Sequence, residues 1–226
     1  MKFVSQKSLL VSLLAVVPFV ASAQLSSNIA LTTNYKFRGQ DQDDKSSKNF
    51  KPALQGGFDY AFGNGLYVGN WNSSVSWLAG NSLEIDVYGG YKGELSPGLG
   101  YDVGVLTYAY PGASSANTTE VYGGLSYGPL SAKYSQTVSS KYFGGSKASY
   151  FNVGYATELT TGLTLKAAVG MTNFKSDTDF SDYSVGLTYD LGDGYSLSGA
   201  QVGATKKADF NGLNDNRFVL TLSKAM

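Results

Sequence analysis

The 226-residue chain contains no cysteine and no histidine. Without cysteine, disulfides, thiolate metal sites and cysteine nucleophiles are excluded. Without histidine, a Ser-His nucleophile pair, a His-ligated zinc and a histidine general base are excluded as well. Carboxylate chemistry is nearly all that remains, so we expect the protein not to be an enzyme and predict no catalytic residue.

An apolar run lies at the N-terminus. Lys2 and Lys7 flank its start, it extends from Leu9 to Val20, and the small residues Ala-Ser-Ala follow at 21–23. This is the pattern of a secretory signal. The run is shorter than the ~20 residues of a transmembrane helix, which disfavours an uncleaved anchor. We expect a cleaved signal peptide at 1–23 and a single exported domain at 24–226.

Charge is sparse and nearly balanced. Charged residues make up 15 % of the chain, and loss of Lys2 and Lys7 with the signal leaves 15 basic against 17 acidic residues. No basic stripe exists that could displace the counterions of a phosphate backbone. We therefore expect no nucleic-acid partner.

Glycine, tyrosine and phenylalanine are abundant, with 28, 17 and 12 residues. Apolar and polar residues alternate with period 2, and no helical repeat follows residue 24. At 83–92, Leu83, Ile85, Val87 and Tyr91 share one face, whereas Glu84, Asp86, Tyr88 and Lys92 share the other. This pattern is typical of strands whose two faces meet different media.

The alternating runs predict twelve strands. They lie at 27–38, 51–62, 66–77, 82–94, 99–110, 119–127, 130–138, 149–159, 163–174, 181–191, 195–204 and 216–224. Most match the ~9–11 residues of a tilted strand that crosses a bilayer, whereas strands of soluble domains average about 5–6. Tight Gly- or Pro-containing turns alternate with longer polar segments, as in transmembrane barrels.

Aromatic residues gather at both ends of the apolar faces. Tyr60, Phe62 and Tyr91 flank tight turns, whereas Trp77 and Phe151 lie near the longer loops. Two aromatic rings are expected where a barrel meets the lipid headgroups. Since unpaired backbone groups are costly in lipid, the sheet must close on itself.

These features together predict an all-β fold. We expect a single closed antiparallel transmembrane β-barrel of about 12 strands, an up-and-down meander with short periplasmic turns and longer extracellular loops. The expected location is the outer membrane of a Gram-negative bacterium, with lipid as a partner. A soluble β-sandwich is the main alternative fold. Uniformly apolar outward faces would suit a monomer, although the sequence leaves the oligomeric state open.

Four segments carry a family resemblance. They are LTTNYKFRGQ at 31–40, ALQGGFDY at 53–60, LEIDVYGGY at 83–91 and EVYGGLSY at 120–127. In these segments, and over essentially the whole chain after the signal, the protein resembles the TorF (Gcw_chp) family of porin-like proteins of proteobacteria. The resemblance implies an outer-membrane barrel and leaves the solute undefined.

Inward-facing charges are the candidate pore-lining residues. Arg38, Lys51 and Arg217 fall on strands that become neighbours when the barrel closes, near the long-loop end. Glu84, Asp86 and Glu120 fall at a similar height across the lumen. The hypothesis is a transverse field that orients dipolar solutes. The alternative, equally weighted, is that these side chains neutralise one another in a filled interior.

No cofactor or metal site is predicted. The acidic run 41–44 (DQDD) offers oxygen ligands for calcium but lacks the glycine and distal glutamate of an EF-hand loop. A solvated loop is the favoured interpretation. The leading functional hypothesis is passive passage of small solutes or ions. The alternative is a structural or partner-binding barrel without an open pore. A twelve-strand barrel could be open, gated or plugged.

Overall fold

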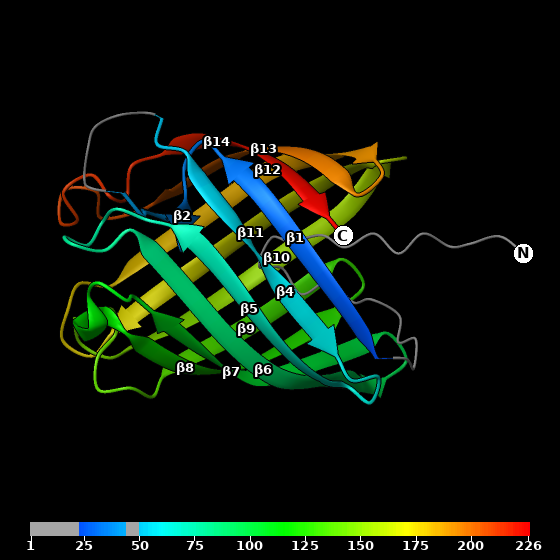
Figure 1. The fold of residues 1–226 in the computed structure, drawn as a ribbon, viewed down its shortest axis with the longest axis horizontal. Coiled ribbons are helices and arrows are strands. Elements are labelled where there is room, and N and C mark those ends of the chain that lie inside the picture. Colours follow the sequence, from blue (N-terminus) through cyan, green and yellow to red (C-terminus); the bar gives the residue numbers. More distant parts are fainter. Residues whose placement is uncertain (1–22, 44–49) are drawn as a thin grey trace, which may run out of the picture.

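A computed structural model describes residues 23–43 and 50–226. Twelve strands form one closed antiparallel barrel (Figure 1). They are β1 (Gln24–Thr32), β4 (Ala53–Ala61), β5 (Leu66–Ser74), β6 (Leu83–Ser96), β7 (Leu99–Ala109), β8 (Thr118–Tyr127), β9 (Leu130–Thr137), β10 (Ala148–Thr160), β11 (Leu163–Phe174), β12 (Phe180–Gly192), β13 (Tyr195–Ala204) and β14 (Arg217–Ala225). Two short strands, β2 (Lys36–Phe37) and β3 (Gln40–Asp41), pair apart from the barrel, and a short 3-10 helix spans Ser114–Ala116.

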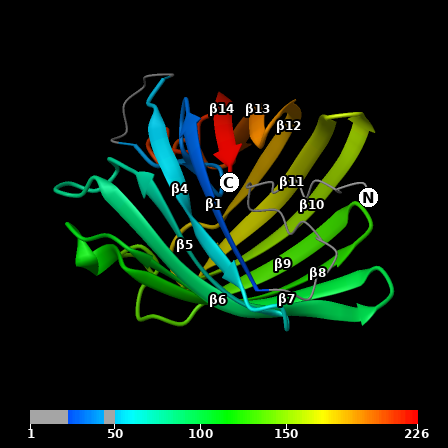
Figure 2. The same cartoon turned by 45° about the vertical axis from the view of Figure 1, so that its right-hand side comes forward.

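Each strand pairs with its neighbour in sequence, and β14 closes the ring on β1. The closing register runs from Asn28 opposite Ala225 to Thr32 opposite Thr221. Figures 1 and 2 show the strands tilted around the barrel, with the longer connections gathered at one end and the tight turns at the other. We call these the long-loop end and the short-turn end. The predicted closed twelve-strand meander is confirmed, and the sandwich alternative is wrong.

Predicted and observed strands agree closely except at the first. The alternation continued to residue 38, but β1 ends at Thr32 and the chain turns inward. Only Ala23 of the predicted signal peptide lies inside the described residues. No helix in the described part of the chain is long and apolar enough to cross a membrane.

The barrel is inside out relative to a soluble domain. On β11, Val169 is 60 % exposed on the outer face, whereas Thr172 on the inner face is fully buried. Large apolar side chains are exposed on the outer faces of all twelve barrel strands. Such a surface is unfavourable in water and suits contact with lipid.

Tyrosine rings cover inward-facing glycines on neighbouring strands. A Cβ atom on Gly104 of β7 would lie 2.5 Å from Tyr122 Oη, and one on Gly90 of β6 would lie 2.5 Å from Tyr67 Oη. In both cases tyrosine and glycine are direct cross-strand partners. The ring occupies the space that a side chain would fill, which explains the joint abundance of the two residue types.

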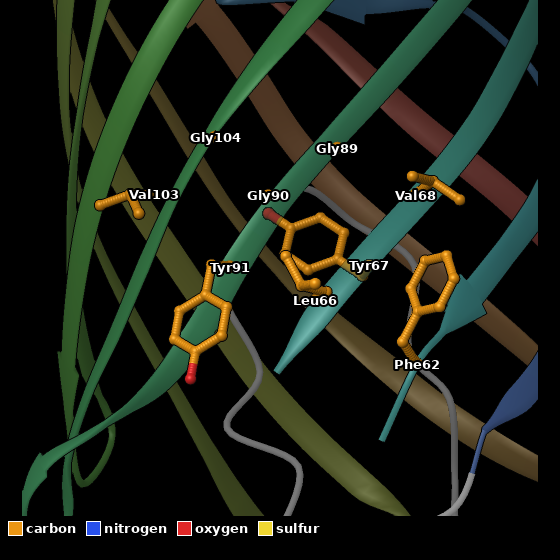
Figure 3. A pocket seen from close by; sticks show the side chains of 9 residues that line it. All are labelled: Phe62, Leu66, Tyr67, Val68, Gly89, Gly90, Tyr91, Val103 and Gly104. Carbon is orange, nitrogen blue, oxygen red and sulfur yellow. The ribbon is translucent and has the colours of Figure 1, made fainter. Parts of the chain in front are cut away.

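The repeated Val-Tyr-Gly-Gly motif follows from this packing. In the copy at 87–90, Val87 and Gly89 face outward, whereas Tyr88 and Gly90 face the lumen. Tyr88 lies against Gly69 of β5 while Gly90 accommodates Tyr67. The outward Gly89 leaves a shallow apolar groove between Val68 and Val103 on the barrel exterior, shown in Figure 3.

Candidate functional site

A hairpin inside the long-loop end is the main feature of the lumen. It comprises residues 34–43, with β2 and β3 joined by a turn at Arg38 and Gly39. Both turn residues have positive φ, +48° and +77°, as a two-residue type I′ turn requires. A Cβ on Gly39 would lie 2.7 Å from Asp182 Cβ and from the Gly203 carbonyl oxygen, so only glycine fits against this wall.

Aromatic contacts hold one side of the hairpin. The Phe37 ring packs edge-to-face against Tyr108 and Phe143, with centroids 5.5 and 5.6 Å apart. Tyr35 packs against Trp71 at 5.5 Å. These rings extend a buried cluster around Tyr110, so the apolar core of the molecule lies inside the mouth of the barrel.

The tip of the hairpin makes a buried ion pair with the wall. The Arg38 guanidinium donates to both oxygens of Glu120 on β8, at 3.0 and 2.7 Å. It also donates to Tyr142 Oη at 3.1 Å and lies 4.1 Å from the Tyr150 ring centroid. The arginine and glutamate side chains are 8 % and 1 % exposed. Bidentate geometry in a dry site fixes the position of the tip.

A second set of ion pairs lies at the base. Asp41 contacts Lys36 at 3.2 Å and Arg217 of β14 at 3.1 Å. Burial raises the pKa of the Asp41 carboxyl above its ordinary value, although both cations act in the opposite direction. Burial likewise lowers the pKa of the Lys36 ammonium, against the effect of Asp41. Desolvation therefore outweighs attraction, and these pairs specify the docked position more than they stabilise it.

The hairpin is also joined to two of the long loops. The Asp41 amide donates to the Leu213 carbonyl at 2.8 Å, and Gln40 donates to Asn214 at 2.9 Å. The Ser76 amide donates to the Gln42 carbonyl at 3.1 Å. The hairpin and the loops at 205–216 and 75–82 together form a cap over the mouth.

An inward residue is buried near the long-loop end of each of the twelve barrel strands. All lie within three residues of the long-loop end of their strands: Thr32, Ala53, Ser73, Glu84, Tyr108, Thr118, Thr137, Ala148, Thr172, Phe180, Ala204 and Arg217. At this end the described residues thus cover an inward side chain on every barrel strand.

The short-turn half of the lumen differs. Most of its inward residues are polar or small and half-buried, among them Asn28, Asp59, Tyr88, Lys133, Lys166, Ser184, Ser198 and Thr221. Asp102, Ser126 and Thr188 are buried. Tyrosine hydroxyls donate to its carboxylates: Tyr67 to Asp102 and Tyr88 to Asp59, both at 2.6 Å. We call this half the inner chamber. It is a polar, solvent-accessible cup closed at the long-loop end by the cap.

The six predicted pore-lining residues all lie at or near the closed mouth. Glu84 and Asp86 lie on β6 and Glu120 on β8, as expected, and Glu84 accepts from Tyr35 and Tyr110 at 2.9 and 2.8 Å. Arg217 begins β14. Lys51 precedes β4 and donates its amide to the Thr33 carbonyl. That the six line a conducting pore stays a prediction.

Arg38 differs most from its expected place. It was assigned to a wall strand, but it lies at the hairpin tip and reaches the acidic wall directly. Opposite charges therefore touch at this point and do not face one another across open space. Asp41, expected in a solvated loop, is buried between two cations, and Asp44 lies outside the described residues.

Sequence reasoning missed the cap residues Tyr35, Phe37 and Asp41. Period-2 alternation continues through the hairpin, so it reads as one long strand. The dipeptide Arg38-Gly39 was the available signal, because glycine is the usual second residue of a type I′ turn. Among the described residues, no cluster of three or more acidic side chains is placed to hold a metal ion.

The comparisons with known proteins agree with this geometry. Residues 20–226 match a family described as "Bacterial protein of unknown function (Gcw_chp)". The chain belongs to the Gcw_chp family. A search of curated proteins gave no significant match.

Solved porins share the fold of this Gcw_chp barrel. A KdgM porin superposes with a TM-score of 0.60 at 13 % identity, covering 88 % of this chain and 98 % of that one. A NanC porin gives 0.56 at 12 % identity, with 89 % and 98 % covered. A KdgM porin in complex with disordered oligogalacturonate gives 0.58 at 11 % identity, with 89 % and 98 % covered. The Gcw_chp chain is thus a porin-like barrel in fold.

Proposed function

We propose that this barrel lies in the outer membrane of a Gram-negative bacterium and passes small polar solutes or ions, with the cap as its gate. The inner chamber carries the proposal. Its half-exposed polar lining holds water inside a barrel whose exterior is apolar. A barrel that served only as an anchor would need no such chamber.

The construction of the cap supports a gate. The hairpin is an excursion between β1 and β4, so it can leave the mouth without breaking any barrel ladder. Its ion pairs position it at a desolvation cost, which a hydrated open state would not carry. The similarity in fold to porins agrees with this role.

The test is conductance of the folded chain in a planar bilayer. Discrete current steps whose size scales with salt concentration would support a pore. Longer open times when the hairpin is displaced would support its role as the gate. Folding is checked by heat-dependent gel mobility. A folded barrel that stays silent after the hairpin is released would refute passage. It would favour the alternative of a barrel whose loops bind a partner.

A further inference from the structure

Two lysines in the inner chamber make no ion pair with a described residue. Lys166 of β11 faces the lumen half-exposed, and no described residue forms a hydrogen bond or ion pair with its ammonium. Its inward neighbours are small: Ala156 and Gly186 are its cross-strand partners, and Ala168 follows on its own strand. Space therefore surrounds the ammonium on the lumen side.

Lys133 of β9 has a similar setting. Its Nζ lies 3.8 Å from the Tyr122 ring centroid and makes no ion pair within the described chain. Because Tyr67 donates to Asp102, the Tyr122 hydroxyl is the donor in its 2.5 Å bond with Tyr67. An ammonium has three N–H donors, and those that are not directed at the ring face are left for another acceptor.

Register places the two lysines on one wall. Lys133 pairs with Asn152 on one edge of β10, and Lys166 pairs with Ala156 on the other edge. Two strand spacings and four residues separate their Cα atoms by roughly 16 Å along the wall. With long side chains, a solute crossing the chamber meets both ammonium groups in turn.

The opposite wall carries acid that is already engaged. In the ring of twelve strands β4 lies six places from β10, which makes the two diametrically opposed. On that wall Asp59 of β4 accepts from Tyr88 at 2.6 Å. Asp102 of β7 lies on the side of Lys133, in one cross-strand row with Gly124 and Lys133, and it accepts from Tyr67. Both carboxylates are thus held by tyrosines, whereas the ammonium groups of Lys133 and Lys166 make no ion pair with a described residue.

We infer that Lys166, together with Lys133, forms a binding step for small anions in the inner chamber. The ligand class is a solute that carries a carboxylate or phosphate group, which the ammonium binds by a charge-assisted hydrogen bond. The inference names the solute class of the pore and so rests on the proposed function. The binding itself does not require an open mouth, because the chamber is accessible from the short-turn end.

The first experiment measures binding without conductance. The full chain without its signal is folded in detergent, its lysines are ¹³C-methylated, and sodium citrate, sodium phosphate and sodium chloride are titrated at matched ionic strength. The NMR signal that is absent from the spectrum of Lys166→Gln is the signal of Lys166. This signal is expected to shift at citrate or phosphate concentrations far below the chloride concentration that shifts it. The separate citrate and phosphate titrations tell which group binds more tightly.

The second experiment measures selectivity in bilayers. Lys166→Gln is expected to lower the chloride-to-potassium permeability ratio several-fold, Lys166→Arg to retain it and Lys133→Gln to lower it less. Lys175→Gln, at an exposed loop lysine outside the cap, is the matched control and should change nothing. If Lys166 shifts with anions but no current flows even after the hairpin is released, the anion site stands and the pore is refuted. If Lys166 ignores citrate and phosphate, or selectivity is unchanged in Lys166→Gln, the anion site is refuted.

Discussion

Arg38 at the hairpin tip and Glu120 on β8 form a two-pronged ion pair, at 3.0 and 2.7 Å, that crosses the mouth of the barrel. β8 lies five places from β1 in the ring of twelve, nearly opposite the strand from which the hairpin departs. The chain thus crosses its own lumen and is fastened on the far side. This one contact links the local turn to the packing of the cap and, in the proposed function, to the state of the gate.

Breaking the tip contact should open the mouth. In Arg38→Gln the buried Glu120 carboxylate loses its cation, and breaking a buried pair on one side costs about 3–5 kcal/mol. Since ~1.4 kcal/mol is a factor of ten, the closed population should fall more than tenfold. Single-channel recording should show longer open times. Exchanging the charges, Arg38→Glu with Glu120→Arg, should recover part of the closure, and equal open times in all three proteins would contradict the gate.

Acid should close the channel. Burial raises the pKa of Asp43, and the neighbouring Asp41 adds to the rise. The cations Lys51, Arg217 and Lys36 lower it by less. Burial also raises the pKa of Asp41. Docking of the hairpin therefore takes up protons. The docked state is most stable below the ordinary Asp pKa of 3.8 and loses this advantage as pH rises through the raised values.

The measurement is open probability between pH 3.5 and 7, about the range in which carboxyls of buried Asp titrate. Open probability should rise with pH. Asp43→Asn should flatten the profile, because the amide does not titrate and leaves the Asp41 ion pairs in place. A steeper profile in Asp43→Asn, or closure at high pH, would contradict the linkage.

Inward glycines should be far less replaceable than outward ones. A Cβ on Gly104 would meet Tyr122 Oη at 2.5 Å, whereas the nearest atoms to a Cβ on Gly89 lie at 3.3 and 3.4 Å. Gly104→Ala must displace the ring and its bond to Tyr67, an overpacking cost of about 1–3 kcal/mol. Gly89→Ala is the control and should cost well under 1 kcal/mol. Denaturant unfolding in detergent would compare them, and equal losses would mean that the rings are not packed on the glycines.

The strands of the barrel wall could be predicted from the sequence, whereas the cap could not. Strand ends such as Leu163 and Phe174 were located correctly, because period-2 alternation is imposed by two media on every residue of a wall strand. The hairpin keeps the same alternation for another reason: its two faces meet two sides of the lumen. Period-2 alternation therefore cannot distinguish a wall strand from a hairpin inside the lumen.

The partners of the site residues depend on long-range closure. Glu120 was correctly placed on an inward face, but its cation lies 82 residues earlier in the chain. That Arg38 reaches it depends on the inward turn after Thr32, which no local pattern encodes. The surroundings of Lys166 likewise depend on the neighbouring strands β10 and β12.

Tethering the hairpin should separate its movement from any other effect of the tip substitution. The Ser76 amide donates to the Gln42 carbonyl at 3.1 Å, which brings the two backbones close to the ~5.5–6 Å Cα separation typical of disulfides. The chain has no cysteine of its own, so Gln42→Cys with Ser76→Cys yields one possible intramolecular bond. In the Arg38→Gln background, oxidation should shorten the open times to near those of the unsubstituted protein. Reduction by dithiothreitol should bring the long open times back. Either single cysteine variant is the control. Long open times that persist in the oxidised protein, with the bond verified by mass, would place the gate elsewhere in the barrel.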